Sequence, residues 1–164
     1  MRALRRVVVL VLALALSAPV LAAGLQAGLE AADRGDYATA LKEWRPLAEQ
    51  GDAGAQYNLG ILHFRGWGVA EDYVEAVKWY RRAAEQGHAG AQLQLGTMYA
   101  KGDGVAQDYV LAHLWFNLAA AAAAHLPTDV IQEIAAEQRH GIEQGMTPAQ
   151  VAEAQRLARE WKPK

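Results

Sequence analysis

The stretch AGAQYNLGILHFRGWGVAEDYVEAVKWYRRAAEQG, residues 53–87, decides the fold because much of it recurs one unit later in the chain. Four motifs of this stretch recur 36 residues later (89 − 53), and the copy of the first motif starts at Ala89. The four motifs are Ala53-Gly54-Ala55-Gln56, Leu59-Gly60, Gly66-x-Gly68-Val69-Ala70 and Asp72-Tyr73-Val74. A fixed period of this length is typical of stacked structural repeats. We therefore predict a repeat architecture.

The first half of the unit has the periodicity of an amphipathic helix. Ala55, Leu59 and Leu62 recur at spacings of four and three residues, which places them on one helix face. Gly60 and its copy Gly96 lie inside this segment, although a glycine costs a helix about 1 kcal/mol relative to alanine. Because glycine has no side chain, we expect a neighbouring helix to approach closely at these two positions.

A glycine turn and a second helix complete the unit. Gly66 and Gly68 permit the positive φ angles of a close turn. Asp72 can accept hydrogen bonds from the free amides that open a helix, so we expect the second helix to start near Tyr73. Two aromatic pairs return in phase along this helix, and we expect them to pack between neighbouring units: Trp79-Tyr80 and Trp115-Phe116.

The register extends beyond the two full copies. Upstream, Asp36-Tyr37 lies 36 residues (72 − 36) before Asp72-Tyr73, and a leading helix over residues 25–34 is expected to open this shortened unit. Downstream, Pro127 can open a helix, and Thr147-Pro148-x-Gln150 reads as a capping box for another. We divide the chain into a signal peptide (1–23), a shortened repeat (24–52), two full repeats (53–88 and 89–126) and a two-helix C-terminal cap (127–164).

The N-terminal residues are typical of a secretory signal peptide. Arg2, Arg5 and Arg6 precede an apolar run over residues 7–16, and the small residues Ala22-Ala23-Gly24 provide a cleavage site. The run is well short of the roughly 20 residues that span a bilayer. We expect a periplasmic or secreted protein with no stable membrane insertion after cleavage, and an uncleaved membrane anchor is the alternative.

The motifs A-x-A-Q-x-x-L-G, G-x-G-V, D-Y-x-x-A-x-x-W and A-A-E-Q-G follow one another along residues 53–87. In this order they resemble the Sel-one-like repeat, a relative of the tetratricopeptide repeat. The resemblance implies an all-α fold, a short right-handed α-solenoid (superhelix) of antiparallel helix pairs, and an adaptor or scaffold role without enzymatic activity. Residues 119–124 depart from the pattern, because alanines replace the closing Glu-Gln-Gly in the second copy.

Residue types argue against several kinds of chemistry. The chain has no cysteine, and its one serine, Ser17, lies in the leader, so the mature chain lacks both common hydrolase nucleophiles. Glu137-x-x-His140-x-x-Glu143 gathers possible metal ligands on one helix face, but no second such helix completes a site. The net charge of −2 becomes −5 (−2 − 3) without the leader arginines, which argues against nucleic acid. We expect no cofactor and no metal.

The resemblance further implies that the leading helices line a concave surface that binds a peptide or protein partner. Transferred position by position, this surface consists of Tyr57, Asn58, Ile61, Phe64, Arg65, Leu93, Thr97 and Lys101. Trp67 is a further candidate in the turn, because its copy is Asp103 and the turn therefore does not require an aromatic residue. Two alternatives stay open: an envelope-associated enzyme or glycan binder, and a structural protein that associates with itself.

Overall fold

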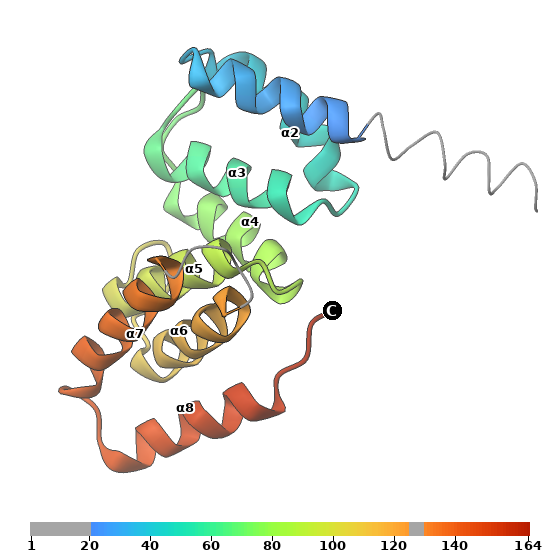
Figure 1. Ribbon diagram of the computed structural model, residues 1–164. Coiled ribbons are helices and arrows are strands. Elements are labelled where there is room, and N and C mark those ends of the chain that lie inside the picture. The colour runs from blue at the N-terminus through green and yellow to red at the C-terminus, as the bar shows by residue number, and fades with distance from the viewer. Residues whose placement is uncertain (1–20, 125–129) are drawn as a thin grey trace, which may run out of the picture.

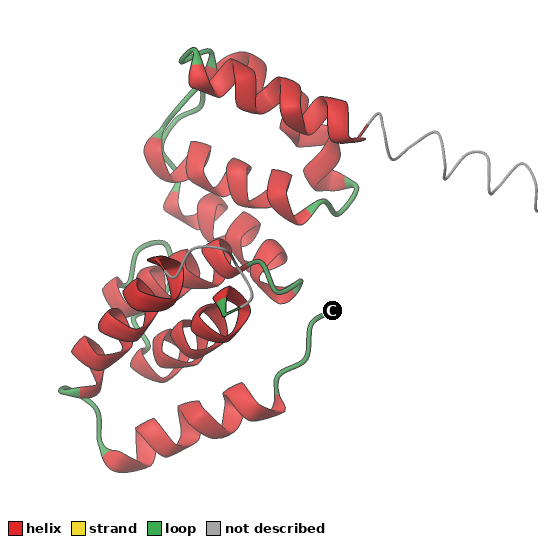
Figure 2. Cartoon of the chain, viewed as in Figure 1, coloured by secondary structure: helices red, strands yellow, loops and turns green. Residues whose placement is uncertain are grey.

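The structure is a computed structural model that describes residues 21–124 and 130–164. In these two ranges all regular secondary structure is helical (Figure 2). A helix over residues 21–33 is followed by α2 (Tyr37–Glu49), α3 (Ala53–Arg65), α4 (Tyr73–Glu85), α5 (Ala89–Lys101), α6 (Tyr109–Ala123), α7 (Val130–Glu143) and α8 (Pro148–Glu160). Pro127 and most of the predicted leader, including Ser17, lie outside the described residues.

The helices stack in chain order, as the repeat predicts. Each helix from α2 to α6 packs against the next one, and the stack continues into α7 (Figure 1). The second helix of each unit is capped by an aspartate, because Asp36, Asp72 and Asp108 accept a hydrogen bond from the third residue that follows, at 2.9–3.1 Å. The all-α stacked fold is therefore confirmed. None of the helices in the described ranges is both long and apolar enough to cross a membrane.

Each of the three helix pairs is closed by a glycine that faces an aromatic ring. A Cβ atom placed on Gly60 would lie 2.5 Å from the Tyr80 ring, and one on Gly96 would lie 2.7 Å from the Phe116 ring. Gly28 faces the indole of Trp44 in the same way. Any side chain at these positions would have to displace a ring from a closely packed core. The predicted close approach at Gly60 and Gly96 is confirmed, and Gly28 adds a third instance.

The tryptophans of the repeated aromatic pairs lie between units. Trp79 is buried in one cluster with Trp44 and Leu47 of α2, and Trp115 is buried in another with Ala83 of α4. Each tryptophan therefore joins its own unit to the preceding one, as predicted. The ring that follows each tryptophan has the additional role of covering the glycine of its own helix pair.

The C-terminal helices both pack against α6, and α8 lies apart from α7 (Figure 1). Ala135 is the buried residue of α7, and Ala154 is that of α8. Trp161, directly after α8, meets the Trp115 ring edge-on at a centroid distance of 6.5 Å. The predicted capping box is present, with Thr147 and Gln150 exchanging hydrogen bonds at the start of α8.

A buried polar network joins α6 to α7. The His113 side chain is 1% exposed, and its Nε2 lies 2.7 Å from Oε1 of Glu143. Its Nδ1 lies 2.9 Å from Nδ2 of Asn117, and Oδ1 of Asn117 accepts a hydrogen bond from Arg139. Because the Asn117 amide nitrogen can only donate, Nδ1 of His113 accepts and Nε2 donates to Glu143. Glu143, which the sequence grouped with possible metal ligands, therefore contributes to helix packing.

Replacement of Gly60 tests the contact that closes the helix pair. We expect Gly60→Leu to lower the free energy of unfolding by about 3 kcal/mol, because the new side chain overlaps the Tyr80 ring. Gly141→Ala is the matched control, since a Cβ atom there meets nothing within 4 Å, and it should stabilise α7 by roughly 0.5–1 kcal/mol. Urea unfolding followed by circular dichroism measures both. Equal midpoints for the two variants would refute the role of Gly60.

Removal of the Glu143 carboxylate tests the polar network. We expect Glu143→Ala to lower the free energy of unfolding by about 1–3 kcal/mol, because the buried Nε2–H group of His113 loses its acceptor. Glu137→Ala, at an exposed position of the same helix, should change stability by less than about 0.5 kcal/mol. Thermal unfolding compares the two, and a Glu143 variant as stable as the Glu137 variant would contradict the assignment.

Candidate partner-binding surface

Three of the predicted contact residues on α3 face the next unit. Tyr57, Ile61 and Phe64 are half-buried and pack against the core cluster formed by α4, α5 and α6. The Tyr57 ring stacks on the His88 ring at a centroid distance of 4.6 Å, directly before α5. Burial also raises the pKa of the Tyr57 hydroxyl. These side chains hold neighbouring units together and offer only their edges to a partner.

Leu93, the copy of Tyr57, is a core residue in this structure. Its side chain is 8% exposed and lies in one cluster with Phe116 of α6 and Ala135 of α7. Thr97, the copy of Ile61, is half-buried, and its hydroxyl donates to the Leu93 carbonyl at 3.1 Å. Position-by-position transfer therefore selected, in Leu93, a residue that packs in the core against α6 and α7.

Three of the predicted residues keep polar groups available. Arg65 and Lys101 are exposed at the C-terminal ends of α3 and α5, where a positive charge is favourable next to the free carbonyl groups. Within the described residues, neither forms an ion pair. Asn58 is half-buried on α3, directly after Tyr57. These three residues lie on neighbouring leading helices.

Five side chains form a continuous stack from the start of α2 to the start of α4, and we call it the aromatic ladder: Tyr37, Trp67, Arg65, Phe64 and Tyr73. The Tyr37 and Trp67 rings stack at 4.6 Å. The Arg65 guanidinium carbon lies 6.0 Å from the Trp67 ring centroid and 5.6 Å from that of Phe64. The Phe64 and Tyr73 rings are 5.2 Å apart. The ladder therefore spans the junction between the first and second units.

The ladder is partly open to solvent. Trp67 remains 40% exposed and Tyr73 37% exposed, although both contact a neighbouring ring. The nearby Glu71 carboxylate raises the pKa of the Tyr73 hydroxyl. The sequence identified Phe64, Arg65 and Trp67 but missed both tyrosines, although the repeated Asp-Tyr motif marks their positions.

The junction between the second and third units, which we call the second junction, provides an internal control for the ladder. The copies of the five ladder residues are Tyr73, Asp103, Lys101, Ala100 and Tyr109, so aromatic side chains are absent at the positions of Trp67 and Phe64. The turn has the same backbone there, with φ angles of 66° and 71° at the glycines of the first turn and 81° and 69° at those of the second. The turn therefore folds without the ladder, which leaves these side chains available for recognition.

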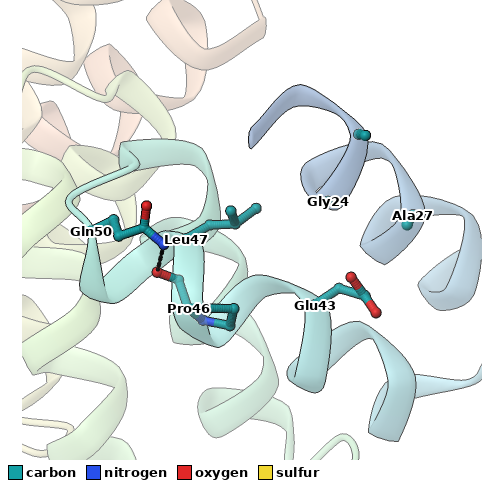
Figure 3. A pocket seen from close by; sticks show the side chains of 7 residues that line it. Gly24, Ala27, Glu43, Pro46, Leu47 and Gln50 are labelled. Atoms are coloured by element: carbon teal, nitrogen blue, oxygen red, sulfur yellow. Dashed lines mark hydrogen bonds between the residues drawn. The ribbon is translucent and has the colours of Figure 1, made fainter. Parts of the chain in front are cut away.

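Two apolar hollows lie away from the ladder. One, of about 470 Å³, is formed by the helix over residues 21–33 and α2 and is lined by Ala23, Gly24, Ala27, Glu43, Pro46, Leu47 and Gln50 (Figure 3). Glu43 occupies the position at which later units carry Trp79 and Trp115, so the hollow lies where a preceding unit would pack. The other, of about 420 Å³, is lined by residues that include His88, Ala122 and Ile131.

Neither hollow gathers groups suited to catalysis. In the first, Glu43 is the one titratable residue, and Gln50 donates to the carbonyl of Pro46 at 3.0 Å (Figure 3). In the second, burial lowers the pKa of His88, and its Nδ1 accepts a hydrogen bond from the Ala91 amide as a helix cap. Within the described ranges, no group of three His, Asp or Glu residues is arranged to hold a metal ion.

The repeat units match a known family. The model of the Sel1 repeat matches residues 53–88 and 89–123. Among solved structures, the chain is similar to c5321, a protective antigen present in uropathogenic Escherichia coli strains that displays an SLR fold. The TM-score is 0.76 and the identity 32%, over 86% of this chain and 29% of that chain. The chain thus spans less than a third of the length of that antigen.

A second solved structure covers a larger share of its own chain. A Sel1 repeat protein from Oxalobacter formigenes is 37% identical, with a TM-score of 0.55 over 62% of this chain and 78% of that chain. No curated protein matches the chain. The predicted resemblance is confirmed by the repeat matches together with this identity, and the chain belongs to the Sel1 repeat family.

Proposed function

We propose that this chain is a non-catalytic module that binds a protein partner on the surface formed by α3, α5 and the turn after α3. Sel1 repeat proteins act as protein–protein interaction modules, which supports this class of function. The observation that carries the proposal is the exposure of Trp67 and Tyr73 beside Arg65, at a junction whose counterpart folds with Asp103 in place of Trp67. Asn58 and Lys101 extend the same surface along the leading helices.

A binding function is favoured over catalysis because the histidine–carboxylate pair that could act in catalysis is engaged in packing between helices. The closest histidine–carboxylate pair, between His113 and Glu143, is engaged with Asn117 and Arg139 between α6 and α7. His113 is almost fully buried, so a substrate could not reach its ring. Tryptophan, tyrosine and arginine, in contrast, are the residue types that dominate binding energy at protein interfaces.

We further propose that the chain acts in the periplasm or outside the cell after removal of the leader. The three arginines, the apolar run and the small residues Ala22-Ala23-Gly24 support this location. The leading helix of the first unit already includes residues 21–23, so cleavage after Ala22 or Ala23 would shorten this helix by less than one turn.

Export is tested in the native host by fractionation and N-terminal sequencing. We expect the mature chain to start at Ala23 or Gly24 and to be recovered outside the cytoplasm. Recovery of full-length chain, starting at Met1, in the cytoplasm or the membrane fraction would reject export with cleavage.

The binding surface is tested by site-specific photo-crosslinking in the native host. A photo-reactive residue in place of Asn58 should capture one protein, identified by mass spectrometry, because this half-buried position belongs to the proposed surface. The matched control replaces Lys78, which is exposed on α4 with a side-chain accessibility of 61%. Capture of glycan alone at position 58 would favour the glycan-binding alternative. Capture of the same protein at both positions would refute the assignment of the surface.

A further inference from the structure

We infer that the aromatic ladder is the energetic centre of the binding surface and that the partner supplies a carboxylate group to Arg65. This inference rests on the proposed function, because it names the chemistry of the partner at the same surface. The carboxylate belongs to an aspartate, a glutamate or the C-terminus of the partner. Three observations carry the inference: the placement of the Arg65 side chain, its lack of an acidic partner, and the difference between the two junctions.

The Arg65 side chain is positioned before any partner binds. Its guanidinium lies between the rings of Phe64 and Trp67, at 5.6 and 6.0 Å from their centroids. Cation–π contacts of this kind restrict the guanidinium plane and leave the N–H groups at its edge free. A guanidinium held in this way can bind a carboxylate through two parallel hydrogen bonds with little further loss of side-chain entropy.

Arg65 forms no ion pair within the described residues, so its charge is not already neutralised by an acidic side chain of the same chain. Four basic residues do form ion pairs with a carboxylate, at 2.6–3.7 Å: Lys78 with Glu75, Arg139 with Glu143, Arg156 with Glu153 and Glu160, and Lys164 with Glu85. The Glu71 carboxylate, in the turn that follows Arg65, interacts with the Tyr73 hydroxyl and raises its pKa. An exposed cation beside exposed rings therefore complements a partner with an acidic group and an apolar neighbour.

The second junction lacks both features of this site. Lys101 replaces Arg65, and a lysine cannot form the paired, planar hydrogen bonds of a guanidinium. Asp103 replaces Trp67, and its carboxylate would repel an incoming carboxylate. We therefore assign the acidic contact to Arg65, and Lys101 contributes a weaker, less directional attraction on the neighbouring helix.

The inference is tested with a library of random peptides selected for binding to the full chain. We expect the selected peptides to require a carboxylate for binding, from Asp, Glu or the C-terminus. Arg65→Gln should weaken binding at least about tenfold, the loss expected when a charged hydrogen bond is removed. Conversion of the peptide carboxylate to the amide should weaken binding equally, and the two changes together should cost no more than either alone.

Two further variants distinguish a loss of the proposed site from the loss of any exposed positive charge. Trp67→Asp reproduces the residue found at the second junction and should also weaken binding, whereas Arg159→Gln removes an exposed charge on α8 and should not. Thermal unfolding of all variants verifies that they fold. Peptides that crosslink at position 58 but bind the Arg65 and Trp67 variants as tightly as the original chain would overturn this inference alone. Absence of any binding peptide would overturn both this inference and the proposed function.

Discussion

The contact between a glycine and an aromatic ring is the constraint on which the helix pairs depend. In the two full units the partners are 20 residues apart in the chain (80 − 60 and 116 − 96), whereas Gly28 and Trp44 are 16 residues apart (44 − 28). The shortened unit thus keeps the contact although its connection is four residues shorter. Because a ring fills the space that a side chain would need, the contact fixes how closely the two helices approach, whatever the length of the loop between them.

Packing between units continues from these pairs into the turns. A Cβ atom on Gly68 would lie 2.8 Å from the backbone carbonyl of Tyr37, and Gly104 faces the backbone of Tyr73 in the same way. Each turn therefore rests directly on the start of the second helix in the preceding unit. This arrangement places Trp67 next to the Tyr37 ring and fixes where Arg65 and Phe64 lie. The candidate site is thus a consequence of how the units stack, although its side chains are not needed for stacking.

Sequence periodicity could predict features that depend on local spacing. The close approach at Gly60, the cap at Asp72 and the capping box at Thr147 all follow from residue types within one turn of a helix. Gly28 was missed because it lies 32 residues before Gly60 (60 − 28), outside the 36-residue register. Tyr57 and Leu93 were assigned to the partner surface by transfer from the family resemblance, and the structure packs both against neighbouring helices, which depends on how the units stack.

The division between stacking and recognition explains why a binding site can occur at one junction alone. The positions that build the core are the same in both full units: the glycine of the leading helix, the aromatic pair of the second helix and the two glycines of the turn. Positions 64, 65 and 67 change to Ala100, Lys101 and Asp103, and the backbone of the turn is preserved. These positions can therefore vary without loss of the turn, although Phe64 and Trp67 also contact neighbouring units where they occur. The Sel1 repeat thus supplies a rigid surface on which a few exposed residues determine the partner.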